Sequence, residues 1–266
     1  MSEHKTDSQD EHVNQEMPLI SHLVELRNRI MKMLGVVILI FLSLAYWSTD
    51  LYTYLAMPLL QAIPNSSTMI ATDVLANFFA PFKLTFMLSI FIAIPFILSQ
   101  VWGFIAPGLY THEQRLVVPL MISSSLLFYC GLLFAYYVVF PLAFGFLAAI
   151  EIQGVQTMPD ITSYLNTVLK LFFAFGITFE IPIAILLLVK MGITTQDSLR
   201  EKRPYVIVGV FVVGMFLTPP DVISQTLLAL PMWALYEVGI YFSKYVTPVG
   251  DSDESSDSES EEQVKS

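Results

Sequence analysis

The feature that most constrains the fold is a set of long apolar runs. The longest, residues 116–150, holds 35 consecutive residues without an Asp, Glu, Lys or Arg. As a helix at ~1.5 Å per residue it exceeds the ~30 Å hydrocarbon core of a bilayer. The chain is 55% hydrophobic with a mean hydropathy of +0.65, which is well above the values of soluble domains. These observations predict an all-α, polytopic integral membrane protein.

Six apolar runs are predicted as transmembrane helices. They span about Met33–Trp47, Phe78–Trp102, Leu116–Ile150, Leu165–Val189, Tyr205–Leu217 and Val222–Phe242. The fifth run has only 13 residues, or ~20 Å of helix, which is short for a bilayer. Prolines within or beside the runs imply kinked helices in a bowl shape, with the third span bent at Pro141. They are Pro58, Pro95, Pro119, Pro141, Pro182 and Pro231.

The charge of the chain separates a membrane domain from two tails. The net charge of −10 lies in the tails, because residues 17–250 carry 11 acidic and 11 basic residues. Residues 1–16 are polar with little to bury, and residues 249–266 are a serine-rich acidic segment, so both are predicted to be disordered. Residues 17–248 form the predicted six-helix domain. It begins with an amphipathic surface helix opened by Pro18, with apolar residues at helical spacing up to Met33.

The distribution of basic residues predicts the orientation in the membrane. Three of the links between spans contain no Lys or Arg, whereas the remaining links and the N-terminal segment are basic. The positive-inside rule therefore predicts that both termini and the loop 99–115 are cytoplasmic. The residues that carry this prediction are Arg27, Arg29, Lys32, Arg115, Lys190, Arg200, Lys202, Arg203 and Lys244.

Glu25 and Glu113 are carboxylates on this otherwise positive face. In one interpretation they bind a cationic peptide, because carboxylates near the low-dielectric membrane boundary hold guanidinium groups in bidentate geometry. In the other, Glu25 pairs with Arg29 four residues further along its helix, and Glu113 pairs with a local arginine. The residues alone leave both interpretations open.

Glu180 is a further candidate, because it lies near the middle of the fourth predicted span. An ionised carboxylate there costs roughly 2.5 to 3.5 kcal/mol. Lys170 is ten residues away, on a different face of the helix, and is not its partner. A hydrated cavity, a protonated carboxyl group, a polar residue of another chain and a structural interhelical hydrogen bond all remain open.

The sequence offers little support for catalysis. The segment His112–Leu116 begins like a zinc-protease motif but lacks its second histidine, and no Walker A motif occurs. All four histidines lie outside the spans, and the single cysteine, Cys130, excludes an intrachain disulfide. We expect no enzymatic activity, cofactor, metal site or nucleic-acid partner.

Four motifs together resemble the TatC family, the core subunit of the twin-arginine protein translocase. They are Pro18–Arg29 (PLISHLVELRNR), Phe104–Glu113 with its FIAPGLY run, Phe179–Pro182 (FEIP) and Leu217–Asp221 (LTPPD). The resemblance covers roughly residues 17–245 in order and spacing. It implies a glove-shaped protein of the bacterial inner membrane that recognises twin-arginine signal peptides and exports folded proteins.

The resemblance also implies roles for individual residues. Glu25 and Glu113 would bind the two arginines with the help of Arg27 and Phe104, and Glu180 would lie in the concave membrane face. Met215, Leu217 and Thr218 correspond to the docking site of the TatB subunit, while Pro58 and Asp221 fall in the non-cytoplasmic links.

In the resembling family, a multimeric complex with TatB and the pore-forming TatA uses the proton-motive force. The alternative function is a proton-coupled transporter of a small solute with Glu180 as its relay.

Overall fold

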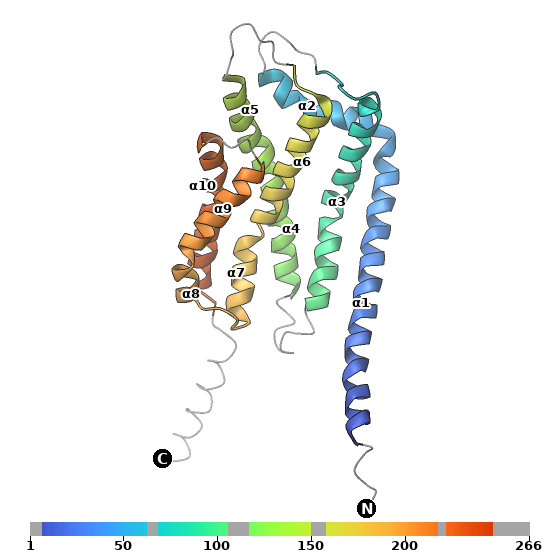
Figure 1. Cartoon of the computed structure of the whole chain (residues 1–266), viewed down its shortest axis with the longest axis vertical. Coiled ribbons are helices and arrows are strands. Elements are labelled where there is room, and N and C mark those ends of the chain that lie inside the picture. Colours follow the sequence, from blue (N-terminus) through green and yellow to red (C-terminus); the bar gives the residue numbers. More distant parts are fainter. Residues whose placement is uncertain (1–6, 63–68, 106–116, 150–157, 218–221, 247–266) are drawn as a thin grey trace, which may run out of the picture.

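The computed structural model describes residues 7–62, 69–105, 117–149, 158–217 and 222–246, and these residues are almost entirely helical (Figure 1). The fold is therefore all-α, as predicted. Within an apolar medium only helices satisfy every backbone group inside one segment, which is why runs of this composition become helices. The α-helices are α1 Asp7–Leu44, α2 Ser48–Ala62, α3 Ala76–Ile105, α4 Val117–Phe134, α5 Phe140–Ala149, α6 Ile161–Thr178, α7 Ile181–Lys190, α8 Gln196–Glu201, α9 Arg203–Leu217 and α10 Val222–Ser243.

The helices run up and down as one layered bundle. Helix α1 packs on α3, α3 on α4 and α6, and α4 on α6, while α10 packs on α7 and α9. Helix α2 lies across one end of the bundle, and α1 projects past the other end, where α10 also ends (Figure 1). The bundle therefore has one end covered by α2 and an opposite end at which α1 begins and α10 ends (Figure 1).

Five helical segments are long and apolar enough to cross a membrane. They are His22–Met57, Ala76–Phe104, Val118–Gly145, Ile161–Lys190 and Val222–Ser243. The fifth predicted span corresponds to α9, a shorter apolar helix of 15 residues. Large apolar side chains on these segments point outward, with Leu39 66% and Phe216 70% exposed, as expected of surfaces that face lipid. The polytopic membrane architecture is thus confirmed, and the sixth crossing stays a prediction.

Helix α1 begins inside the predicted N-terminal tail. Its first residue is Asp7, and it passes through Pro18 without a break; disorder of residues 1–16 stays a prediction. Adding residues to an existing helix costs little compared with nucleating a new one. The downstream part of α1 can therefore extend the helix toward the N-terminus at little cost.

The helices are irregular at two of the predicted proline bends, Pro141 and Pro182. Pro141 is preceded by a π-helical turn, Ala135–Val139, which joins α4 to α5. In the fourth predicted span, the helix breaks at Glu180, the N-cap of α7, and Pro182 stands in the first turn of α7. A proline at 182 donates no N–H to the carbonyl of Thr178, so α6 ends there.

Helix α6 lies at the centre of the hydrophobic core. Its side chains Leu165, Val168 and Phe175 are fully buried, against partners from α2, α3, the π-helical turn Ala135–Val139, α5 and α10. Burial of one such side chain contributes about 1.5–3 kcal/mol in water; in a bilayer the tight packing of these apolar groups replaces that term.

A hydrogen-bonded network fastens the start of α6 to α2 and to the link before α3. The hydroxyl of Tyr52 donates to the carbonyl of Ile161, and that of Tyr164 to the carbonyl of Leu55, both at 2.9 Å. Asp160 caps α6 by accepting from the Ser163 N–H at 2.9 Å. Its other oxygen accepts from the N–H and hydroxyl of Thr72 at 3.1 and 2.8 Å. We refer to these residues as the α2–α6 network.

Candidate functional site

Two of the predicted site residues meet where α1 crosses the end of α3. Glu25 lies on α1 and Phe104 in the last turn of α3, and Arg29 connects the two helices. Its Nε and Nη2 donate to Glu25 Oε1 at 3.0 and 2.6 Å, and its Nη1 and Nη2 donate to the carbonyls of Gln100 and Gly103 at 3.1 and 2.9 Å. We call Glu25, Arg29, Gln100, Gly103, Phe104 and His22 the α1–α3 site.

The aromatic part of the site is a stacked pair. The rings of His22 and Phe104 lie 4.2 Å apart between centroids, with planes inclined by 20°. His22 also approaches Glu25, with Nδ1 4.0 Å from Oε2. Phe104 is therefore held against α1 within one helical turn of the Glu25 carboxylate.

Glu25 keeps one oxygen open. Arg29 occupies Oε1 on the inner side, while among the described residues Oε2 has only the more distant His22 ring beside it. The carboxylate side chain is 40% exposed, compared with 21% for Arg29. The local pairing of Glu25 with Arg29 that the sequence allowed is present, yet Oε2 stays available to a ligand.

The pocket beside this carboxylate is polar and positively charged. It has a volume of about 380 Å³ and is lined by Val24, Glu25, Asn28, Arg29, Lys32 and Gln100. One carboxylate faces two cationic side chains in this lining. A guanidinium ligand that enters here needs a second carboxylate, since charges of the same sign within a few ångströms repel even at a partly exposed site.

The remaining predicted binding residues do not join this cluster in the same way. Arg27 is exposed and donates to the side chain of its neighbour Asn28 at 3.3 Å. Glu113 lies outside the described residues. The geometry therefore brings together Glu25 and Phe104 and leaves the roles of Arg27 and Glu113 as predictions.

Sequence reasoning missed the role of Arg29 as a link between helices. The pair of residues 25 and 29 was visible as a spacing of four, but its contacts to Gln100 and Gly103 span 71 and 74 residues. The glycine was the available signal: a Cβ at residue 103 would lie 2.6 Å from Arg29 Nη1. A side chain larger than hydrogen at this position would therefore displace the guanidinium.

Glu180 lies at the junction of α6 and α7, with its backbone in helical conformation. Its Oε1 is buried and has no hydrogen-bond partner among the described residues, and the same holds for Ser124 Oγ. Ser124, on α4, is the polar side chain that lies near this carboxyl group. A buried acceptor without a partner costs about 1–3 kcal/mol, so Glu180 is kept at this position against a local cost to stability.

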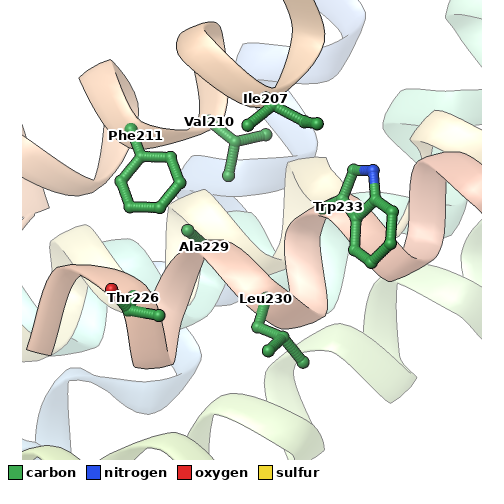
Figure 2. A pocket seen from close by; sticks show the side chains of 7 residues that line it. All are labelled: Ile207, Val210, Phe211, Thr226, Ala229, Leu230 and Trp233. Carbon is green, nitrogen blue, oxygen red and sulfur yellow. The ribbon is translucent and has the colours of Figure 1, made fainter. Parts of the chain in front are cut away.

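Helices α9 and α10 border an apolar groove near the predicted docking residues. The groove has a volume of about 210 Å³, with Ile207, Val210 and Phe211 from α9 facing Thr226, Ala229, Leu230 and Trp233 from α10 (Figure 2). Met215 is 50% exposed and follows Phe211 by one helical turn, which places it on the same stripe of α9 as the groove.

The other members of the predicted set lie as follows. Leu217 is half-buried and packs against the main core. Pro58 lies within α2, so the non-cytoplasmic link predicted around it contains a helix. Thr218 and Asp221 lie outside the described residues.

No cluster of three or more His, Cys, Asp or Glu side chains suited to a metal ion occurs in the described ranges. Two further polar contacts join pairs of helices. Lys83 Nζ donates to Asn166 Oδ1 at 2.6 Å, and Arg203 Nη2 to Glu237 Oε2 at 2.6 Å. Lys83 and Glu237 therefore each have a protein partner.

Comparison with known proteins gives a consistent family. Residues 21–231 match the family described as "Sec-independent protein translocase protein (TatC)". The chain is 59% identical over 238 residues to the protein of that name from Escherichia coli K12, covering 90% of this chain and 92% of the relative. It is 39% identical to the one from Aquifex aeolicus, covering 87% and 96%.

A solved structure agrees with this family. It is a crystal structure of the twin arginine translocase receptor TatC, with a TM-score of 0.75 and 38% identity. The similarity covers 84% of this chain and 98% of that one. Sequence and fold are therefore similar to the same kind of protein over most of their lengths.

Proposed function

Since the chain belongs to the TatC family of Sec-independent protein translocases, we propose that it is the receptor and core subunit of a twin-arginine translocase. Its family and its several apolar helices indicate a multi-pass protein of the inner membrane that takes part in protein transport. The further step is that the α1–α3 site binds the paired arginines of signal peptides. The observation that carries it is the outward-facing Oε2 of Glu25 beside Phe104.

Charge at the site favours a ligand held by two carboxylates. Glu25 alone faces Arg29 and Lys32 across its pocket, so it can accept one guanidinium only where another carboxylate compensates. Glu113 is the nearest acid in sequence after α3, and the loop that carries it continues directly from Phe104. Two planar guanidinium groups paired with Glu25 and Glu113 form charge-assisted bonds that an ammonium group does not reproduce.

The orientation follows from the basic residues. The α1–α3 site lies at the end of the bundle where α8 and the end of α10 also lie (Figure 1), and Arg200, Lys202 and Arg203 belong to this end. The positive-inside rule then makes this the cytoplasmic end, with both termini inside and six crossings. Signal peptides reach such a site from the compartment where precursors are made and folded.

The apolar groove between α9 and α10 is the surface that we propose for the partner subunits. We propose that TatB docks at Met215, Leu217 and Thr218, with the apolar groove of Figure 2 continuing the face of α9 that carries Met215. TatA joins on signal occupancy, in a multimeric complex that uses the proton-motive force. No catalytic residue is assigned.

The test is export of a folded reporter with a twin-arginine signal in cells that lack their own TatC. Rescue by this chain is expected, as is its loss in Glu25→Ala and Glu113→Ala. Glu201→Ala, which removes an exposed acid on α8 at the same end, serves as the matched control and retains export. Full rescue by both site variants would refute the receptor assignment.

A second candidate function rests on Glu180. Its buried, unpartnered Oε1 also suits a proton relay in a transporter of a small solute. Cross-linking separates the two: a peptide with Arg-Arg, but not with Lys-Lys, captured by a Glu113→Cys variant supports the receptor. Solute accumulation driven by a pH gradient in vesicles that contain this chain alone supports the transporter.

A further inference from the structure

We infer that Arg29 is a positioning residue of the α1–α3 site, which orients Glu25 so that the carboxylate discriminates arginine from lysine in the ligand. This inference rests on the proposed function, because it concerns how the same site reads its peptide. It assigns to Arg29 a role distinct from that of the ligand-binding carboxylates.

Arg29 is firmly held between the two helices. Its guanidinium makes four hydrogen bonds to three acceptors, of which two are backbone carbonyls of α3. The Gly103 carbonyl belongs to the last turn of α3, where carbonyls have no partner within their own helix. The negative end of the helix dipole adds to the attraction for a cation there. Arg29 is therefore fixed by α3, and its side chain is mostly buried.

The fixed guanidinium of Arg29 in turn orients the carboxylate of Glu25. Nε and Nη2 both bind the same oxygen, Oε1, at 3.0 and 2.6 Å. This single-oxygen contact turns Oε1 toward α3 and leaves Oε2 outward, on the side of the His22 and Phe104 stack. A ligand guanidinium therefore meets one oriented oxygen beside an aromatic face, a geometry that suits a planar cation able to donate and stack at once.

Gly103 leaves the space that the guanidinium of Arg29 occupies. A Cβ at residue 103 would lie 2.6 Å from Arg29 Nη1 and 3.4 Å from Arg29 Cζ. The contact can thus be disturbed from either helix: by changing the guanidinium on α1 or by adding one methyl group on α3. Two unrelated substitutions with one shared consequence make the inference testable.

The experiment measures binding of two labelled peptides to the full chain in lipid nanodiscs. The peptides are identical except for an Arg-Arg or a Lys-Lys pair, and the readout is the ratio of their dissociation constants. Arg29→Lys keeps the charge but cannot reach the same acceptors, and Gly103→Ala keeps Arg29 but displaces it. Gly35→Ala on α1 is the matched control, since no described heavy atom lies within 4 Å of the added carbon.

Both Arg29→Lys and Gly103→Ala are expected to reduce the discrimination ratio by about tenfold, the scale of one charge-assisted hydrogen bond. The double variant is expected to lose no more than either single variant, because both disturb one contact. Gly35→Ala keeps the wild-type ratio.

The outcomes separate this inference from its premise. If the wild-type chain does not distinguish the peptides, the proposed function itself fails. If the wild type distinguishes them and both variants retain the ratio, or weaken the two peptides equally, Arg29 is only a structural link between α1 and α3 and the inference is overturned.

Discussion

Asp160 offers a sharp test of how the ends of the helices are held together. Its carboxylate uses both oxygens, one to cap α6 through the N–H of Ser163 and one to bind the N–H and hydroxyl of Thr72. Backbone pairing of Ile70 with Pro159 and Ile161, at 3.0 and 2.9 Å, runs beside these bonds. Asp160→Ala therefore removes the cap and the tether of the link before α3 in one step.

The expected magnitude follows from the contacts. Loss of the cap costs about 1 kcal/mol, and each exposed bond from Thr72 contributes about 0.5 kcal/mol, at the low end of the range because water competes for it. The total of about 2 kcal/mol corresponds to a fall in the unfolding midpoint of about 4–8 °C for a domain of this size. Thermal unfolding of the purified protein in detergent at pH 7 measures it.

The pH dependence has a definite sign. The Ser163 N–H, followed by the Thr72 hydroxyl, lowers the pKa of Asp160 from its ordinary 3.8 to about 2. Folding thus favours the ionised form, and its contribution is complete above about pH 4 and is lost as the pH falls toward 2. Asp160→Asn, whose amide does not titrate, is the reference, and the difference in midpoint between wild type and Asp160→Asn should close over this interval. The reasoning would be refuted if wild type and Asp160→Asn had equal unfolding midpoints at pH 7, or if the difference between their midpoints persisted unchanged to pH 2.

Three further changes have definite expectations. Gly131→Ala places a Cβ 2.7 Å from the backbone oxygen of Phe175, so α4 must separate from α6. The free energy of unfolding should fall by about 1–3 kcal/mol. Gly145→Ala is the control, because no described atom lies within 4 Å of its added carbon, and it should show no such loss. Tyr164→Phe removes the buried bond to the Leu55 carbonyl and should cost about 1 kcal/mol in thermal unfolding; an equal loss in the exposed Tyr205→Phe would contradict this. Insertion of four apolar residues into α9, which has 15 residues and is ~22 Å long, should remove a local thinning of the bilayer and reduce export of a folded reporter; unchanged export would end that explanation.

Much of the fold was accessible from the sequence because a bilayer leaves few solutions for apolar chains. The uncharged run through residue 150 predicted a long helix bent at Pro141, and the structure has a π-helical turn directly before that proline. Pro182 likewise marked the place where α6 gives way to α7. Hydropathy did not reveal that α2 turns across the end of the bundle, because that direction depends on bonds from Tyr52 and Tyr164 to carbonyls 109 residues away.

The candidate site was predictable in its parts but not in its connections. The position of Glu25 on a basic face marked it as unusual, and the family resemblance added Phe104. The contacts that join them depend on how α1 packs against α3, which no local spacing encodes: Arg29 to Gly103, and His22 to Phe104. The bond from Lys83 to Asn166 is likewise absent from any local spacing, since Asn166 comes from a helix 83 residues further along the chain.

The π-helical turn before Pro141 changes which helices the two halves of this span, α4 and α5, pack against. The Phe140 N–H bonds to the Ala135 carbonyl, five residues back, so the chain gains one residue in that turn compared with an ordinary α-helix. One extra residue rotates everything that follows by about 100° about the axis. That rotation directs Phe140 and Phe144 into the core, so that α5 packs on α2 while α4 packs on α3 and α6. A one-residue deletion between Ala135 and Val139 would keep the composition and hydropathy of the span, yet it would swing both aromatic rings out of the core.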